Sequence, residues 1–197
     1  MTSAARKLEP KTIAEFDDLL EQQGDEAGLF ELIDGVIVMM TNPTLRHGVI
    51  VGNIGARLKL AMVKRGCQSF QGDLRIQRNA DRTAPYKPKP DVIVRCGPSS
   101  PERDLQTYVD DPVVVVEVLS PSTMDYDRGL KLQFYKSLPT LKHVVIVYQD
   151  EVRIEHYQRS GRRWSMKVHE NRDEVLDLST VAFTMTVAEV YSDVSVA

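Results

Sequence analysis

Two acidic residues beside apolar runs carry the strongest chemical signal in this sequence. Glu117 follows four consecutive valines and precedes Val118 and Leu119. A strand of that composition is covered on both faces, where an ionised carboxylate is costly unless it is protonated, paired with a basic group or bound to a metal ion. Asp91 begins a second apolar run directly after Pro90. Carboxylates on neighbouring strands that point to the same face can share Mg²⁺, which uses one or two protein carboxylates and keeps positions for water and phosphate.

Each of these carboxylates also has a purely structural interpretation. Glu117 by itself is compatible with a salt-bridged strand glutamate near the end of a sheet, and Asp91 by itself with a turn residue that caps the start of a strand. A metal ion shared by the two would polarise a phosphoryl oxygen and help to generate hydroxide as the nucleophile. The pair therefore predicts metal-assisted phosphodiester hydrolysis, provided that the two strands are neighbours.

The composition is that of an ordinary globular protein. The 197 residues are 42% apolar and 27% charged, which suits one domain with a real core. The formal net charge of -3 does not point to nucleic-acid binding, although it permits a local basic groove. Cys67 and Cys96 form neither a zinc motif nor a disulfide framework, and a reducing cytosol is the simpler interpretation. The first residues lack an apolar signal core and no apolar run is long enough to cross a bilayer, so we expect a cytoplasmic protein with no membrane partner.

The predicted elements alternate between helices and strands around a central sheet. Residues 1–10 form a loose lead-in, and Asp34-Gly35 predicts a tight hairpin because these residues tolerate positive φ. Helices are expected at 12–24, 44–65 and about 124–137, the last capped by Ser120–Thr123, and strands within 29–40 and at 67–78, 91–94, 113–119, 142–149, 151–158 and 163–169. Residues 176–192 are mixed and are expected to end in a short helix. The chain is thus predicted to be a single α/β (α+β) domain over 1–197, with an N-terminal helix and β-hairpin and a core at about 29–150.

Several strings resemble the Uma2 family of putative restriction endonucleases, a branch of the PD-(D/E)XK nuclease superfamily. They occur in matching order over about 29–150 and are Phe30–Ile37, Pro43 with His47, Lys89–Val94, Val116–Thr123, Asp127–Lys131 and Tyr135. The resemblance implies a restriction-endonuclease-like core, a mixed β-sheet flanked by helices, in which Asp91 is the aspartate of the motif and Glu117 its (D/E). Glu31 matches an acidic residue that many members place ahead of the core, where it can join the metal site. The family thus implies Asp91, Glu117 and Glu31 as catalytic and metal-binding residues, with Mg²⁺ or Mn²⁺ as the cofactor.

Leu119 departs from the superfamily motif, which has a lysine two residues after Glu117. A lysine there orients the attacking water and offsets developing negative charge, and leucine can do neither. The Uma2 family also tends to be aliphatic at this position. The resemblance singles out Lys131 on the following helix as the catalytic substitute, and the alternative is a weak surface ion pair with Asp127. A second departure, at Leu138–His143, replaces the Gly-Val and Tyr-Trp common in the family and is expected to affect packing or dimer contacts.

Two further residues with family counterparts are candidates for substrate contact or for supporting the site. His47 near the start of 44–65 is a candidate for phosphate contact or proton transfer, and Tyr135, four residues after Lys131, for a hydrogen bond in the site. The alternatives are a surface or packing histidine and a core tyrosine with a polar tip. Basic residues could also line a groove for phosphates, unless they form solvated faces: Arg57, Lys59, Lys64, Arg65, Arg75, Arg78, Arg82, Lys87 and Lys89.

These observations predict a Mg²⁺-dependent endonuclease that hydrolyses DNA. A homodimer is also expected, since duplex cleavage often uses two active sites and the family tends to dimerise. Two other function classes stay open. The missing lysine at position 119 favours a nuclease-fold protein that has lost catalysis and binds DNA or a partner. The acidic net charge is consistent with a structural or partner-binding domain that has no role with nucleic acid.

Overall fold

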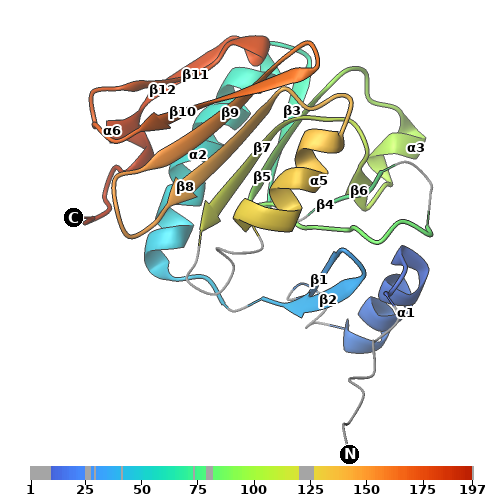
Figure 1. The fold of residues 1–197 in the computed structure, drawn as a ribbon. Helices are drawn as coiled ribbons and strands as arrows, with labels where there is room; N and C mark the ends of the chain where they lie inside the picture. The colour runs from blue at the N-terminus through green and yellow to red at the C-terminus, as the bar shows by residue number, and fades with distance from the viewer. Residues whose placement is uncertain are drawn as a thin grey trace, which may run out of the picture.

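The computed structural model describes residues 10–24, 28, 30–40, 42–72, 74–78, 82–119 and 127–196. The centre of this part of the chain is a six-stranded β-sheet with the strand order β10-β9-β8-β7-β5-β3 (Figure 1). β7 and β8 run parallel, whereas the other neighbouring pairs are antiparallel, so the predicted mixed sheet is confirmed. The strands are β3 (Cys67–Gln71), β5 (Val92–Cys96), β7 (Pro112–Leu119), β8 (His143–Tyr148), β9 (Ile154–Ser160) and β10 (Arg163–His169).

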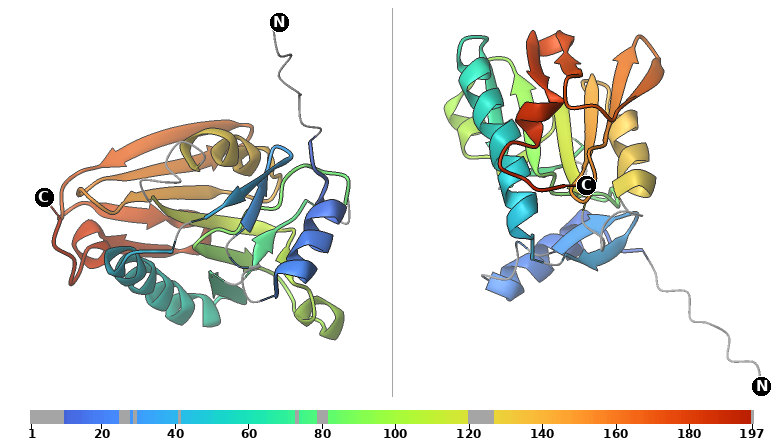
Figure 2. Two further views of the ribbon diagram at one scale, coloured as in Figure 1. Left: turned by 90° about the horizontal axis from the view of Figure 1, so that it is seen from below. Right: turned by 90° about the vertical axis from the view of Figure 1, so that its left-hand side faces the viewer.

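β7 lies in the interior of the sheet, as its valine-rich composition predicts. Successive side chains of a strand point to opposite faces. Val116 joins the core cluster that packs against α2 (Leu45–Val63), while Val115 joins the cluster that packs against α5 (Leu132–Ser137). The two helices cover opposite faces of the sheet (Figure 2, right). Because Glu117 has the parity of Val115, its side chain projects to the face that α5 covers.

The layer on the α2 face is completed by the C-terminal part of the chain. It contains β11 (Val175–Leu178), the short 3-10 helix η3 (Ser179–Val181), β12 (Phe183–Thr186) and α6 (Val187–Val190), so the predicted short terminal helix is confirmed. Gly55 of α2 packs against the side chain of Gln71 in β3. A Cβ atom at Gly55 would lie 2.2 Å from Cδ of Gln71, so a larger residue there requires the end of that side chain to move.

An N-terminal unit lies across one end of the central sheet (Figures 1 and 2). It consists of α1 (Ile13–Gln23), β1 (Phe30–Ile33) and β2 (Val36–Met39), with the two strands paired antiparallel. Asp34 and Gly35 form the turn with φ values of 50° and 74°. Positive φ at both central residues is what a two-residue turn of the right twist requires, so the predicted hairpin is confirmed.

Two predicted elements differ from the observed ones. The strand predicted at 67–78 divides into β3 and β4 (Arg75–Ile76), and β4 pairs with β6 (Tyr108–Val109) in a separate small sheet. β6 and α3 (Pro101–Asp104) lie in a segment that is rich in turn residues, and such short elements depend on tertiary contacts more than on propensity.

The helix predicted at about 124–137 is observed over its second part. A π-helical turn, η2 (Asp127–Lys131), leads directly into α5. The predicted cap at Ser120–Thr123 lies outside the described residues. Single π-turns of this kind are frequent at functional sites.

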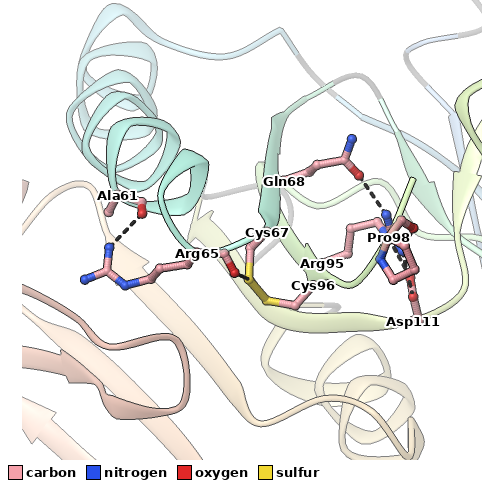
Figure 3. Close-up of a disulfide and its surroundings, with 8 residues drawn as sticks. All are labelled: Ala61, Arg65, Cys67, Gln68, Arg95, Cys96, Pro98 and Asp111. Atoms are coloured by element: carbon pink, nitrogen blue, oxygen red, sulfur yellow. Dashed lines mark hydrogen bonds and ion pairs between the residues drawn. A yellow bond between two sulfur atoms is a disulfide. The ribbon is translucent and has the colours of Figure 1, made fainter. Parts of the chain in front are cut away.

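Cys67 and Cys96 are joined by a disulfide, which the sequence analysis did not expect (Figure 3). They are 29 residues apart in the chain but are register partners across β3 and β5. Only that register brings the two sulfur atoms together, and it cannot be read from the spacing of the cysteines. No helix in the described ranges is both long and apolar enough to span a membrane. The cytoplasmic location stays a prediction.

Candidate active site

Asp91, the residue before β5, lies beside the end of β7 that carries Glu117. Val92 is the register partner of Val116, so the residue before β5 lies opposite Glu117. In addition, Asp91 Oδ2 accepts a hydrogen bond of 2.7 Å from the backbone N–H of Val118. The two carboxylates that the sequence singled out are therefore cross-strand neighbours at one end of the sheet.

Glu117 is held by two side chains from the helical segment that follows β7. Its side chain is 5% exposed. Lys131 Nζ lies 2.8 Å from Glu117 Oε1, and the Tyr135 hydroxyl donates a hydrogen bond of 2.5 Å to the same oxygen. Lys131 and Tyr135 are four residues apart, so one turn of helix brings both to one face, as predicted.

Lys131 connects Glu117 to the N-terminal hairpin. Its ammonium lies 3.3 Å from both carboxylate oxygens of Glu31 in β1. The side chains of Lys131 and Glu31 are only 1% and 3% exposed. A surface ion pair is therefore wrong as an account of Lys131. Glu31 Oε1 also accepts a hydrogen bond of 2.6 Å from the backbone N–H of Lys89, two residues before Asp91.

Tyr135 is fully buried and acts as a donor. Burial raises the pKa of its hydroxyl well above the ordinary value of 10, and the negative charge of Glu117 raises it further. The hydroxyl thus stays protonated at neutral pH and donates to Glu117. This contact matches the predicted hydrogen bond in the site rather than a role in core packing alone.

His47 approaches Asp91 from the first turn of α2. Its Nε2 lies 3.3 Å from Asp91 Oδ1, and the two side chains are 13% and 21% exposed. Asp91 and His47 thus form the more open side of the site, whereas Glu117 lies deeper. The helix begins at its N-cap Thr44, whose hydroxyl accepts a hydrogen bond of 3.1 Å from the His47 backbone N–H.

Gln149 supports this arrangement and was not identified from the sequence. The Thr44 hydroxyl donates to Gln149 Oε1 at 2.6 Å, and Gln149 Nε2 donates to the Leu119 carbonyl at 2.9 Å. The side-chain amide therefore connects the start of α2 to the end of β7. Its place directly after the apolar run of β8 was the available signal, since a buried polar residue at a strand end needs partners.

The residues of the site fit a hard divalent cation. Asp91 and Glu117 supply the one or two carboxylates with which Mg²⁺ is usually bound. In the described part of the chain, no three His, Cys, Asp or Glu side chains are arranged so that they could hold one metal ion together. Glu31 is instead in contact with Lys131 and the backbone of Lys89. A direct bond from Glu31 to the metal stays a prediction.

Comparison with known proteins shows matches along nearly the whole chain. The family model described as "Uma2: Putative restriction endonuclease" matches residues 13–188. Two uncharacterized proteins of Synechocystis sp. (strain ATCC 27184 / PCC 6803 / Kazusa) are 29% identical. One, sll1609, aligns over 154 residues, covering 78% of this chain and 84% of its own length. The other, slr1290, aligns over 185 residues, covering 94% and 92%.

A solved structure shares the fold. It is described as a putative nuclease belonging to DUF820 from Anabaena variabilis ATCC 29413. The match has a TM-score of 0.74 and covers 93% of this chain and 98% of the other at 18% sequence identity. At that identity the likeness concerns the fold, and it confirms the predicted restriction-endonuclease-like architecture.

Proposed function

This chain belongs to the Uma2 family of putative restriction endonucleases, and from this premise we propose that it is a metal-dependent endonuclease acting on DNA. The observation that carries the proposal is the cross-strand pair of Asp91 and Glu117 beside the buried ammonium of Lys131. A nuclease function is further supported by the description of the Anabaena variabilis structure as a putative nuclease.

In this proposal, Asp91 and Glu117 are the residues that hold the metal. When bound, Mg²⁺ or Mn²⁺ supplies Lewis acidity for the phosphoryl oxygen and the attacking water. Tyr135 keeps one Glu117 oxygen oriented by donating a hydrogen bond to it. His47, on the more open side beside Asp91, contacts a phosphate or accepts a proton.

Lys131 takes the role that the motif assigns to the residue at position 119. Leu119 is 1% exposed and packs in the core cluster under α5, so its side chain serves the core. The Lys131 ammonium lies 2.8 Å from Glu117 and offsets negative charge that develops on the phosphate. In a buried site this effect is large, because little solvent screens the charge. Glu31 acts by holding the ammonium in place.

A second candidate is a nuclease-fold protein that binds nucleic acid or a partner without cutting. The observation in its favour is that Lys131 already bridges Glu31 and Glu117, so a cation lies between two of the three carboxylates. The two candidates differ in what a divalent ion does. In the nuclease it binds at Asp91 and Glu117 and permits cleavage, whereas in the binding protein no divalent ion permits cleavage.

The test combines metal binding with cleavage. We expect Mn²⁺ to raise the melting temperature of the wild-type protein, because it binds the folded state, and the Asp91→Asn variant to lose this shift. Plasmid DNA, single-stranded and branched oligonucleotides and a matched RNA are then incubated with Mg²⁺, Mn²⁺ or EDTA. Metal-dependent cutting of DNA supports the proposal. Cutting of RNA alone would correct the substrate, and no cutting despite metal binding would favour the binding protein.

The proposal includes a homodimer in the cytoplasm. Two active sites in one particle allow both strands of a duplex to be cut. Light scattering coupled to size-exclusion chromatography measures the mass directly, and a monomer at micromolar concentration would contradict this part of the proposal.

A further inference from the structure

Most of the basic residues that the sequence could assign to one groove form two groups that lie apart. Lys59, Lys64 and Arg65 are near the C-terminal end of α2, and Arg65 lies beside the disulfide, where it donates to the Ala61 carbonyl (Figure 3). His47, which contacts Asp91, is near the other end of this helix. At a rise of about 1.5 Å per residue, Lys64 is about 25 Å farther along the axis than His47. These residues are therefore remote from the candidate active site.

The second group surrounds a hollow between α1 and the segment that leads into β5. The hollow has a volume of about 460 Å³. Its charged lining residues come from three parts of the chain and are four cations and two carboxylates: Arg75, Arg82, Lys87 and Lys89, with Asp17 and Glu21. A local excess of positive charge in a chain whose formal net charge is -3 favours an anionic ligand.

This hollow shares a wall with the candidate active site. Lys89 lines the hollow, and its backbone N–H donates to Glu31 Oε1 at 2.6 Å. Glu31 in turn contacts Lys131 at 3.3 Å. Arg75 lies on the same side, where its guanidinium donates to the Phe30 carbonyl at 2.6 Å. Glu31 of β1 thus lies between Lys89, which lines the hollow, and the Lys131 ammonium beside Glu117.

The charges in the hollow differ in how accessible they are. Lys87 is 7% exposed at its side chain and lies 2.6 Å from Asp17, so it is part of the framework. Arg82 is 59% exposed and lies 3.3 Å from the same carboxylate. An exposed ion pair of this kind contributes little free energy, so an incoming anion can compete for the Arg82 guanidinium. Arginine binds phosphate through two parallel N–H groups, which suits this position.

We propose that this hollow binds a phosphate group of the nucleic-acid strand next to the bond that is cut, through Arg82 and the Lys89 ammonium. The identity of the strand rests on the proposed nuclease function. The nucleic-acid strand thus runs from the Asp91–Glu117 pair across β1 toward α1. It does not follow α2 to its C-terminal end. The N-terminal unit is then part of the substrate-binding surface.

The experiment measures binding apart from cleavage. A fluorescently labelled DNA duplex is titrated with protein in EDTA, over a series of salt concentrations, and anisotropy gives Kd. We expect Arg82→Gln and Lys89→Gln each to weaken binding about tenfold and to lower the slope of log Kd against log salt by about 1. The Lys89 substitution keeps the backbone N–H that binds Glu31. Lys59→Gln and Lys64→Gln are the matched controls and should leave both quantities unchanged.

The outcomes separate this inference from the proposed function. If the Arg82 and Lys89 variants bind like wild type, or the two controls lose as much affinity as they do, the inference is overturned even when the wild-type protein cuts DNA. If binding depends on Arg82 and Lys89 but no metal produces cleavage, the phosphate site stands and the nuclease proposal fails. Melting curves check the fold of each variant, which the exposure of Arg82 should leave intact.

Discussion

Two buried glutamates in the same row of the sheet have opposite surroundings. Glu117 in β7 is the register partner of Ile146 in β8, and Ile146 is the partner of Glu155 in β9. Both carboxylates therefore project from the face that α5 covers. Glu117 is 4% exposed and Glu155 is 1% exposed. By burial and by position they are equivalent, so any difference in role must come from their partners.

Glu155 is fully compensated. Tyr148 and Tyr157 each donate a hydrogen bond of 2.9 Å to it, and Arg128 and Arg153 lie 3.1 and 3.4 Å away. Burial raises the pKa of Glu155, but the hydrogen bonds from the two tyrosines and the charge of Arg128 outweigh burial, and the pKa lies below its ordinary value. Arg128 thus pairs with Glu155, and Arg153 lies between Glu155 and Glu170, which is 2.6 Å away.

The surroundings of Glu117 have the reverse balance. Two buried carboxylates, those of Glu31 and Glu117, share the ammonium of Lys131, whereas two guanidinium groups lie beside Glu155. Asp91, which contacts His47, lies at the neighbouring position across the two strands. The comparison shows that a buried strand glutamate is not by itself a sign of function. The ratio of acids to bases around it is the better indicator.

The two cations come from the same π-helical turn. Arg128 and Lys131 are both in η2, three residues apart, yet Arg128 reaches Glu155 and Lys131 reaches Glu117. One short segment therefore supplies both a structural ion pair and a candidate catalytic residue. Their different roles follow from the carboxylate that each one meets.

The largest expected effect is the loss of cleavage when Glu117 is replaced by glutamine, with Glu155→Gln as the matched control. We expect Glu117→Gln to reduce metal-dependent cleavage by at least about 100-fold, more than the loss of an outer partner of a metal ligand. Glu155→Gln should keep wild-type activity per folded molecule. Cleavage assays on protein whose folded fraction is measured by circular dichroism make this comparison. Equal loss of activity in both variants would contradict the distinction between the two sites.

Stability should respond to the same two variants in the opposite order, with the larger loss in Glu155→Gln. Glu155→Gln removes the partner of Arg128 and one of the two carboxylates beside Arg153, so the free energy of unfolding should fall by about 2 to 3 kcal/mol. In metal-free protein, Glu117→Gln should change it by less than about 1 kcal/mol, because Lys131 keeps Glu31 as a partner. Urea titrations of both variants in EDTA give the two values. A larger loss for Glu117→Gln would contradict the comparison.

Acidification should destabilise the protein through the opposite face of the sheet first. Burial lowers the pKa of His143 and His156, which lie 2.9 Å apart, from 6.5 to about 4. Because the unfolded chain binds protons that the folded chain does not, the free energy of unfolding should fall by a few kcal/mol as the pH decreases from 6.5 to 4. Glu155, whose pKa is lowered, adds a loss only below about pH 4.5.

Urea titrations at a series of pH values check this order. A His156→Gln variant should show a smaller change between pH 6.5 and 4.5, whereas Glu155→Gln should leave that range unchanged. A loss of stability that starts only below pH 4.5 in the wild-type protein would contradict the role given to the histidine pair.

The smallest expected effects on cleavage and stability come from removing the hydroxyl groups of Tyr135 and Tyr157. Tyr135→Phe removes the hydrogen bond to Glu117, so cleavage should fall about tenfold and the free energy of unfolding by about 1 kcal/mol. Tyr157→Phe is the matched control, since it removes the equivalent hydrogen bond to Glu155. It should cost similar stability and leave cleavage unchanged. Equal cleavage by the two variants would show that Tyr135 does not act through Glu117.

Much of the fold could be predicted from local patterns. The valine-rich run of β7, the turn at Asp34-Gly35 and the helix that begins at Thr44 follow from rules that act within a few residues. Most of the candidate site could also be predicted, because Glu117 interrupts an apolar strand and Asp91 precedes another. Glu155 was missed because only Ile154 precedes it in its strand and mostly polar residues follow it, so it does not interrupt an apolar run.

The features that depend on long-range register could not be predicted. The Cys67–Cys96 disulfide exists because β3 and β5 pair in one register, and the burial of Lys131 depends on the hairpin that brings Glu31 to it. The division of basic residues between the C-terminal end of α2 and the hollow beside α1 likewise requires the packed structure. Spacing along the chain does not contain these distances.

By itself, the sequence determined the types of element and the carboxylates available for chemistry, because strand and helix periodicity and the cost of a buried charge act on neighbouring residues. Only the tertiary structure decided which charges meet. It set Asp91 opposite Glu117, brought Lys131 between Glu117 and Glu31, and matched Glu155 with two arginines. The physical reason is that the electrostatic energy of a buried carboxylate depends on groups within a few ångströms in space, and strand register and helix packing choose those groups.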